Sequence, residues 1–461
     1  MHLGDRLSRA ARDHPHAPAF VHGEDRLTYA DWDEASDLAA ARLEALGLKP
    51  GDVVALLLPS TPEYPVAYLA AAKAGLVTSG INPRLGPREI EFILERSGAR
   101  ALVSEDGLRS LSPATPSRAE PSDDPVLAIV WTSGTTGHPK GAVYRESSLD
   151  AIARIESALD PRPSARTLSG VPLAHMAFMT KIAATIDRLT CTVFPSGAWS
   201  AADALDLIER ERITHMGGIP TQLTLMLRDP ELPTRDLSSV RECIVGGAPV
   251  SPELVAEIRQ SLDVPVVVRY SCTEVGLCCA TRPGDADEVV AHTVGRPLPE
   301  VEVRIGDGGE ILVRSPAMFA GYWNDPEATR EAVDPDGWFH TGDVGELRED
   351  GNLLLLGRSR DVYIRGGYNV YPAEVEAVLL EHPKVSLAAV IGVPDDVLGE
   401  RGLALVVPAD PADPPGEEEL KAFVASRIAD YKAPDRVEVR PELPLTPMFK
   451  VDKAALRATP P

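Results

Sequence analysis

A segment rich in glycine and hydroxyl side chains, WTSGTTGHPKG at residues 131–141, directly follows the apolar run VLAIV. Backbone N–H groups and hydroxyls in such a loop can surround phosphate oxygens, and a lysine adds a cation. The spacing differs from the Walker A loop, because a glycine rather than Ser or Thr follows Lys140. The segment predicts either a phosphate-binding loop of another kind or a solvated connection after a strand. Its candidate phosphate contacts are Thr132, Ser133, Gly134, Thr135, Thr136, Gly137 and Lys140.

This loop resembles the phosphate loop of the acyl-CoA synthetase, adenylation-domain and luciferase superfamily of adenylate-forming enzymes, and the resemblance covers nearly the whole chain. Downstream, YSCTE at 270–274 is similar to the family's YGxTE segment, with Ser271 in place of the usual glycine. The resemblance implies that Tyr270 packs near the adenine, Thr273 binds the α-phosphate region and Glu274 holds Mg²⁺. A carboxylate suits a hard cation that bridges triphosphate oxygens. Taken alone, a Thr-Glu pair is also typical of a helix cap.

Three further segments follow the family's order along the chain. VGGAPVSPEL at 245–254 resembles the adenine-contacting turn, where Gly246, Gly247 and Ala248 allow close approach of the base. HTGD at 340–343 resembles a segment whose Asp343 accepts hydrogen bonds from the ribose hydroxyls. GRSRDVYIRGGYNVYPAEVE at 357–376 resembles the hinge segment, in which Arg358 reaches the ribose. The first two segments alone would also fit ordinary tight turns.

The hinge segment implies a moving C-terminal domain. By resemblance, Arg360 occupies the position about which this domain pivots. Gly366 and Gly367 would border a narrow pantetheine tunnel after the rotation, where a side chain would block entry. A Gly-Gly hairpin turn is compatible with that role.

A lysine near the C-terminus completes the resemblance. LPLTPMFKVDK at 443–453 is similar to the family's terminal lysine motif, and Lys450 falls at the place of the catalytic lysine. An ammonium aimed at the α-phosphate and the attacking carboxylate would stabilise charge that develops in the transition state. Met448 and Phe449 depart from the small residue and glycine that usually precede this lysine. The other interpretation of Lys450 is a surface lysine.

The resemblance places the acid among VPLAHMAFM (171–179), GGIPTQLTLML (217–227), the turn at 246–248 and residues 272–276. His175 takes the place of the family's gating histidine or aromatic residue, with a core or capping histidine as the alternative. The stretches are apolar, contain no Asp for an ammonium and no arginine, although Arg228 and Arg269 lie close in sequence. We therefore expect a neutral aliphatic or aromatic monocarboxylate. The predicted pocket residues are His175, Met176, Phe178, Met179, Leu223, Cys272, Val275 and Gly276.

The elements that must position these residues alternate between apolar strands and helices, which predicts an α/β fold with largely parallel sheets. From residue 301 short alternating strands predict a small antiparallel lobe, and residues 108–125 read as an exposed connection. The resemblance implies a large N-terminal domain of two α/β subdomains plus a small β lobe, followed by a small mobile α+β C-terminal domain. We expect the N-terminal core at 1–357, a hinge at 358–361 and the C-terminal domain at 362–461, with a last helix around 417–430.

Composition narrows the partners. The 461-residue chain carries 69 acidic and 46 basic residues, a formal charge of −23 that would repel nucleic acid or an anionic membrane. The five cysteines include no CxxC pair, so neither a disulfide framework nor a zinc site is expected. No apolar run approaches the roughly 20 residues of a membrane helix. We expect a cytoplasmic monomer or homodimer that acts on a small-molecule acid.

The activity implied by the resemblance is ATP- and Mg²⁺-dependent formation of an acyl-AMP, followed by transfer to coenzyme A. Another acceptor or oxyanion is the first alternative: the phosphopantetheine of an acyl carrier protein, an amine, or a small inorganic acid such as nitrite. An inactive relative that senses nucleotide or acyl ligand is the second.

Overall fold

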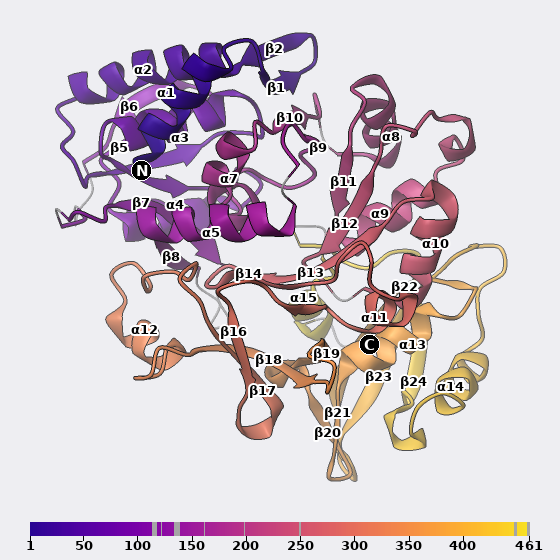
Figure 1. Cartoon of the computed structure of the whole chain (residues 1–461). Helices are drawn as coiled ribbons and strands as arrows, with labels where there is room; N and C mark the ends of the chain where they lie inside the picture. Colours follow the sequence, from indigo (N-terminus) through magenta and orange to yellow (C-terminus); the bar gives the residue numbers. More distant parts are fainter. Residues whose placement is uncertain are drawn as a thin grey trace.

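The computed structural model describes residues 1–458 except 113–117, 121, 133–138, 161, 198, 249 and 447–449. It confirms a mixed α/β fold with a large N-terminal domain and a small C-terminal domain. Figure 1 shows the first helices and strands at the upper left, α8 to α10 at the upper right and the C-terminal part at the lower right. No helix in the described ranges is long and apolar enough to cross a membrane.

The first sheet has six strands in the order β6-β5-β3-β4-β7-β8. Its four central strands are parallel and both edges are antiparallel. Residues 53–56 of β3 are apolar and fully buried, as expected for a parallel strand covered on both faces. The elements are α1 (Leu3–Asp13), α2 (Tyr29–Ala45), β3 (Val53–Leu57), α3 (Glu63–Lys73), β4 (Val77–Gly80), α4 (Pro87–Ser97), β5 (Ala101–Ser104), β6 (Gly107–Ser110), β7 (Val126–Thr132), β8 (Lys140–Arg145) and α5 (Glu146–Leu159).

The second sheet has nine strands in the order β15-β14-β13-β12-β11-β9-β10-β1-β2, parallel from β13 to β1. Helix α5 packs against α7 between the two sheets. The elements are β1 (Pro18–His22), β2 (Asp25–Thr28), β9 (Arg166–Leu168), α6 (Met176–Met179), α7 (Ile182–Asp187), β10 (Cys191–Phe194), α8 (Ala201–Arg210), β11 (His215–Gly218), α9 (Pro220–Leu227), η1 (Leu232–Thr234), β12 (Glu242–Gly246), α10 (Pro252–Leu262), β13 (Val266–Cys272), β14 (Gly276–Ala280), α11 (Asp287–His292) and β15 (Arg296–Pro297).

A four-stranded antiparallel lobe, β16-β17-β18-β19, follows as predicted. Its elements are β16 (Glu302–Ile305), η2 (Asp307–Gly309), β17 (Glu310–Arg314), α12 (Pro326–Ala332), β18 (Phe339–Leu347) and β19 (Leu353–Arg358). The largest hydrophobic cluster of the protein includes side chains of this lobe, of the first sheet and of β13 and β14. The lobe therefore shares a core with the rest of the N-terminal domain.

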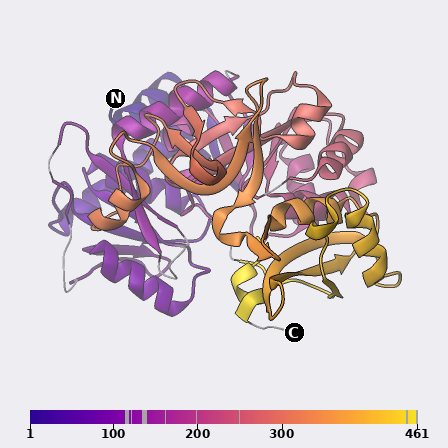
Figure 2. The ribbon, with the colours of Figure 1, turned by 90° about the horizontal axis from the view of Figure 1, so that it is seen from below.

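The C-terminal domain is built on a five-stranded sheet in the order β21-β20-β23-β22, with β24 beside β23. Its two hydrophobic clusters contain only residues after 362, so it has a core of its own. In Figure 2 it lies below the half of the molecule that contains α8 to α10. The elements are η3 (Ser359–Asp361), β20 (Tyr363–Arg365), β21 (Tyr368–Val370), α13 (Pro372–Leu380), β22 (Val385–Asp395), β23 (Gly399–Pro408), α14 (Glu417–Ala425), η4 (Asp430–Lys432), β24 (Arg436–Val439) and α15 (Lys453–Ala458).

Two local predictions need correction. The expected last helix at 417–430 ends at Ala425, because the backbone turns to an extended conformation at Ala429 although the Ile428 N–H still bonds to the Val424 carbonyl. A later helix, α15, is the last one. The expected exposed connection at 108–125 begins inside an edge strand, β6, which pairs with β5.

Candidate active site

Three of the predicted segments lie at the carboxyl ends of parallel strands, where open α/β sheets bind their ligands. The first follows β7, the second follows β12 at Gly246 and the third ends β13 at Cys272. Thr132 and Lys140 are cross-strand partners, so β7 and β8 hold the two ends of the predicted phosphate loop together. Ser133, Gly134, Thr135, Thr136 and Gly137 lie outside the described residues.

Tyr270, Asp343 and Arg358 form one hydrogen-bonded group. The Tyr270 hydroxyl donates to Asp343 Oδ2 at 2.7 Å, and Arg358 Nε lies 3.0 Å from Asp343 Oδ1. Asp343 and Arg358 face each other across β18 and β19, which explains their contact. Burial raises the pKa of Tyr270 well above its ordinary value, and Asp343 raises it further, so the phenol stays protonated and keeps donating. The predicted ribose residues are thus brought together with the predicted adenine residue.

Glu274 lies in the turn between β13 and β14 with its carboxylate directed at the lobe. Its Oε1 accepts a hydrogen bond from the Tyr322 hydroxyl at 2.8 Å, and Lys140 Nζ lies 5.1 Å from the Tyr322 ring centre. Burial raises the pKa of Glu274, whereas Tyr322, Arg358 and Lys140 lower it. Beside it, the carbonyl of Thr273 accepts the Tyr144 hydroxyl, and Ser271 pairs with Leu277 in the hairpin.

Glu274 fits a cation that is held mainly by phosphate. Within the described ranges no group of three or more His, Cys, Asp or Glu side chains could hold a metal ion. A single half-buried carboxylate near the phosphate-loop lysine suits Mg²⁺, which prefers one or two protein carboxylates together with phosphate and water oxygens.

Lys450, from the C-terminal domain, lies near the turn at Gly247 and near Asp343 and Arg358. A β-carbon built on Gly247 would lie 3.9 Å from Lys450 Cε. Burial lowers the pKa of Lys450, Arg358 lowers it further and Asp343 raises it, so all three side chains share one electrostatic environment. Close to Lys450, the Thr446 N–H donates a hydrogen bond to the Lys450 carbonyl at 2.7 Å. Met448 and Phe449 lie outside the described residues.

The turn beside Lys450 requires glycine. Gly247 is exposed and has φ +80°, a left-handed conformation that strains other residues. A β-carbon on Gly246 would lie 2.5 Å from the carbonyl oxygen of Arg269, its neighbour on β13. Ala248 follows in the same bend. A side chain at Gly246 would therefore collide with β13, whereas the predicted close approach of the base stays a prediction.

His175 is a helix cap on which the charges of two lysines act. It caps α6, where its Nδ1 accepts the Ala177 N–H at 3.2 Å. Burial, followed by the charges of Lys450 and Lys181, lowers the pKa of His175 to about 3. The imidazole is therefore neutral at physiological pH.

The other predicted acid-pocket residues are mostly packed in cores. Phe178 meets Tyr64 edge to face at 6.1 Å, and the Met179 carbonyl accepts the Tyr68 hydroxyl at 3.0 Å, so both pack towards α3. Gly276 lies near Ile152 of α5: a β-carbon there would be 3.7 Å from the isoleucine side chain. Met176, Leu223 and Val275 are buried, and Cys272 is half-buried.

The predicted tunnel glycines lie elsewhere. Gly366 and Gly367 are exposed in the turn between β20 and β21, with φ +57° and +89°, and Figure 1 shows this hairpin at the lower edge of the molecule. Arg360 lies in η3, whose Ser359 hydroxyl donates to the Gly342 carbonyl at 3.1 Å. The structure thus brings Lys450, and not the tunnel glycines, to the nucleotide residues.

Sequence reasoning missed a charged group, called here the Glu156 cluster, formed by buried Glu156 and half-buried Lys181 and Arg269. Lys181 Nζ lies 2.6 Å from Glu156 Oε1, and Arg269 Nη1 donates to Glu156 Oε2 at 3.2 Å. Burial alone raises the pKa of Glu156, but the two cations outweigh it and lower the pKa to about 2. The sequence contained only a weak clue to this cluster. Lys181 follows the 171–179 stretch by two positions and Arg269 immediately precedes YSCTE, so both residues lie just outside the segments singled out by resemblance.

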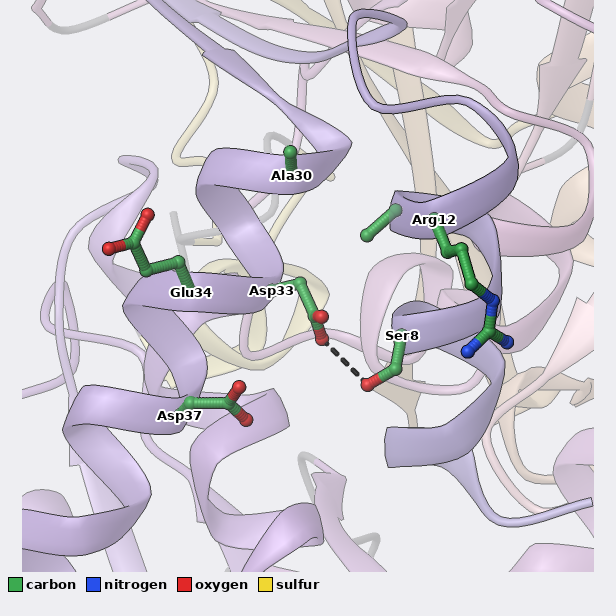
Figure 3. Close-up of a pocket in the computed structure, with 7 residues that line it drawn as sticks. Ser8, Arg12, Ala30, Asp33, Glu34 and Asp37 are labelled. Atoms are coloured by element: carbon green, nitrogen blue, oxygen red, sulfur yellow. Dashed lines mark hydrogen bonds between the residues drawn. The ribbon is translucent and has the colours of Figure 1, made fainter.

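A surface depression between α1 and α2, shown in Figure 3, is a different kind of feature. The Ser8 hydroxyl donates to Asp33 at 2.9 Å. Lys73 Nζ lies 2.6 Å from both Asp33 and Asp37. Two of its acidic side chains are thus already paired within the protein, on helices that lie at the outer edge of the molecule (Figure 1).

Comparison with known proteins gives consistent matches. The family model described as AMP-binding enzyme matches residues 7–323, and the AMP-binding enzyme C-terminal domain matches 374–450. The chain is 35% identical to a feruloyl-CoA synthase of an Amycolatopsis species, over 99% of this chain and 98% of that protein. It is 34% identical to the long-chain-fatty-acid–CoA ligase FadD13 of Mycobacterium tuberculosis, over 99% and 98%. The amide bond synthetase McbA of Marinactinospora thermotolerans has a similar structure, with TM-score 0.88, 32% identity and 99% of both chains covered.

Proposed function

The chain belongs to the AMP-binding enzyme family, and we propose that it activates a carboxylic acid with ATP as acyl-AMP and transfers the acyl group to the thiol of coenzyme A. One observation carries the proposal. Lys450 of the C-terminal domain lies against Gly247 and shares an electrostatic environment with Asp343 and Arg358 of the N-terminal domain. A cation preorganised beside a nucleotide site stabilises the charge that develops when the α-phosphate reacts.

In the proposed nucleotide complex, Asp343 accepts the ribose hydroxyls. Its carboxylate is already oriented by the Tyr270 hydroxyl and by Arg358, so it needs little rearrangement to bind. The adenine packs beside Tyr270 and the turn at 246–248, whose glycines admit a flat base. The phosphates lie towards Lys140 and the loop that β7 and β8 hold.

In the first half-reaction, a carboxylate oxygen of the acid attacks the α-phosphorus of ATP. A bond forms between that oxygen and phosphorus, the bond to the bridging oxygen breaks, and pyrophosphate leaves with the electron pair. Lys450 neutralises charge on the α-phosphate, and Thr273 and Glu274 adjoin it. Glu274 would hold Mg²⁺, which supplies neutralisation of the triphosphate when bound.

In the second half-reaction, we propose that residues 362–461 rotate against the core 1–357 about the hinge 358–361. The rotation about Arg360 withdraws Lys450 and brings Gly366 and Gly367 to the acyl-AMP. The thiol loses its proton, its sulfur bonds to the acyl carbon, and AMP leaves. We place the reaction in the cytoplasm, since all five cysteines are unpaired.

The test is pyrophosphate release from ATP and Mg²⁺ over a panel of acids, with and without coenzyme A, with products identified by mass. Acyl-CoA formation is the expected result. Accumulation of acyl-AMP that coenzyme A does not change would show that the acceptor is different, and an amine would be tested first because a similar structure is that of an amide bond synthetase. No pyrophosphate release with any acid would contradict the enzymatic proposal and favour a ligand sensor.

A further inference from the structure

Residues 319–323, called here the bridging segment, lie between β17 of the antiparallel lobe and α12. On one side the segment is hydrogen-bonded to β8, where the Trp323 N–H donates to the Gly141 carbonyl at 2.8 Å. Gly141 directly follows Lys140, the lysine at the end of the predicted phosphate loop. The lobe is thus fixed, backbone to backbone, to the strand that carries Lys140.

The bridging segment is also hydrogen-bonded to Glu274, in the turn between β13 and β14. The Phe319 N–H donates to the Glu274 carbonyl at 2.8 Å. The Tyr322 hydroxyl donates to Glu274 Oε1, also at 2.8 Å. These two bonds hold the backbone and the side chain of Glu274 at once, so the lobe sets the direction of its carboxylate.

Tyr322 is itself held in place by its neighbours. Its backbone N–H donates to Thr329 Oγ1 at 2.9 Å, and its ring meets Phe319 edge to face, with 4.9 Å between ring centres. Gly321, just before it, has φ +117°, and a β-carbon there would lie 2.9 Å from Thr329 Cγ2. A side chain fixed by packing and hydrogen bonds in this way can orient another residue.

The phenol of Tyr322 contacts two predicted site residues with two different parts. Its hydroxyl bonds to Glu274, and its ring centre lies 5.1 Å from Lys140 Nζ. That distance is within the roughly 6 Å over which the face of an aromatic ring attracts a cation. A carboxylate has about four acceptor positions, and the bond from Tyr322 uses one, so the others can serve a cation.

We propose, on the basis of the adenylation function proposed above, that Tyr322 is a positioning residue for the magnesium–triphosphate group. Its hydroxyl orients Glu274 and its ring places Lys140 before ATP binds. Tyr322 acts through these two residues and does not touch the reacting atoms. Without it, the two side chains would be ordered only when the ligand binds, and the cost of ordering them would weaken binding.

The size of the effect follows from the role of the hydroxyl. Removal of a group that hydrogen-bonds a metal-ligating carboxylate typically reduces metal affinity or activity by about 10–100-fold. Tyr322→Phe removes one hydroxyl and keeps the ring, and the backbone bond from Phe319 to Glu274 remains. We therefore expect the lower end of that range, about 10-fold.

The first experiment measures binding without turnover. Isothermal titration calorimetry gives the dissociation constant of α,β-methylene-ATP, which cannot release pyrophosphate, with saturating Mg²⁺ and again with EDTA. The ratio of the EDTA value to the Mg²⁺ value is called here the metal enhancement. In Tyr322→Phe the metal enhancement should fall by about 10-fold, while binding in EDTA stays within about 2-fold of wild type. An unchanged metal enhancement would overturn the proposal.

Two controls separate positioning from general damage. Tyr29→Phe removes a phenol hydroxyl that bonds to the Thr185 and Thr190 carbonyls at 3.0 and 3.2 Å, and it should leave the metal enhancement unchanged. AMP lacks the β- and γ-phosphates, so Tyr322→Phe should bind AMP as wild type does. A comparable loss of AMP affinity in Tyr322→Phe would show a structural role and contradict the proposal.

Tyr322→Leu separates the ring from the hydroxyl. It should bind α,β-methylene-ATP in EDTA about 3-fold more weakly than Tyr322→Phe does, because Lys140 loses the ring face that holds it. Equal binding in EDTA by the two variants would overturn the part assigned to the ring.

A double-mutant cycle tests whether Tyr322 acts through Glu274. In the Glu274→Ala background, adding Tyr322→Phe should change the metal enhancement by less than about 2-fold, because the carboxylate that the hydroxyl orients is gone. A full 10-fold effect in that background would show that the two residues act independently, against the proposal.

Turnover gives the last check, with an acid that supports pyrophosphate release. The Mg²⁺ concentration at half-maximal rate should rise about 10-fold in Tyr322→Phe, while saturating Mg²⁺ restores kcat and the KM for the acid does not change. A lower kcat that Mg²⁺ does not restore would contradict positioning. If wild type failed to bind α,β-methylene-ATP at all, the proposed function itself would fail. Binding by wild type that Tyr322→Phe leaves unchanged would count against this inference alone.

Discussion

The proposed nucleotide site and the Glu156 cluster are organised differently. On the nucleotide side, Tyr270, Asp343 and Arg358 belong to sequence segments with recognisable spacing, and their charges balance locally. In the Glu156 cluster, Glu156 and Lys181 come from no such segment, and Glu156 is shared by two cations, Lys181 and Arg269. A site for an invariant substrate such as ATP can be built from local motifs at strand ends. The Glu156 cluster is instead assembled from separate elements that meet only in the folded protein.

The largest expected effect is on the Glu156 cluster. Glu156→Gln leaves Lys181 and Arg269 buried without their carboxylate, and removing one partner of a buried ion pair typically costs about 3–5 kcal/mol. Chemical denaturation should show a loss of that order in the free energy of unfolding. Glu300→Gln, which breaks only the exposed pair with Arg154, should change it by less than about 1 kcal/mol.

The pH dependence of the same variant gives a second readout. The pKa of Glu156 is about 2 in the folded protein and 4.5 ordinarily, so its contribution is fully present above pH 4.5 and is lost as the pH falls towards 2. The stability difference between wild type and Glu156→Gln should therefore shrink in acid. A difference that stayed constant down to pH 2 would show that Glu156 does not act through its charge.

On the nucleotide side, Lys450→Ala should slow acyl-AMP formation by about 10²–10³-fold, the usual effect of losing one preorganised charge at a transition state. Thioester formation from supplied acyl-AMP should continue, since Lys450 is withdrawn in that step. Rates for the two half-reactions are measured separately. Lys384→Ala, which removes a partly exposed lysine paired with Asp413, serves as the control. Equal loss of both half-reactions would contradict the proposed rotation.

Asp343→Asn should raise the KM for ATP by about 10–100-fold, because hydrogen bonds to a charged acceptor contribute about 1.5–3 kcal/mol. Steady-state kinetics with ATP as the varied substrate provide the measurement. Glu302→Gln is a matched control, since Glu302 and Arg314 form an exposed cross-strand pair in the same lobe. If both variants raised the KM alike, the Asp343 effect would be structural.

The smallest effect, about 10-fold, is expected for Gly367→Val, which should slow the second half-reaction while adenylation proceeds. Its φ of +89° adds local strain of about 1–2 kcal/mol for any side chain. Gly351→Val is the control for this backbone strain, since Gly351 also has a positive φ, +80°, and open space around it. Comparable slowing in both variants would remove the support for a tunnel at Gly367.

Much of the fold was predictable because its signals are local. The apolar run VLAIV forms most of strand β7, and the predicted alternation of strands and helices gives the two largely parallel sheets. The end of α14 was misjudged, since the helical hydrogen bonds continue to Ile428 beyond the helix proper. Phe178 and Met179 were assigned to the acid pocket from their position beside His175, but sequence does not reveal that they pack towards α3.

The sequence by itself determined the element types, the order of the nucleotide segments and the places where glycine is needed, because each depends on neighbours in the chain. Only the tertiary structure decided that Glu156, Lys181 and Arg269 meet, although 113 positions separate the first from the last. It also decided that Lys450 lies at Gly247, because that contact depends on how one domain docks on the other. Burial then set the charge state of these groups, and burial is a property of the packed molecule.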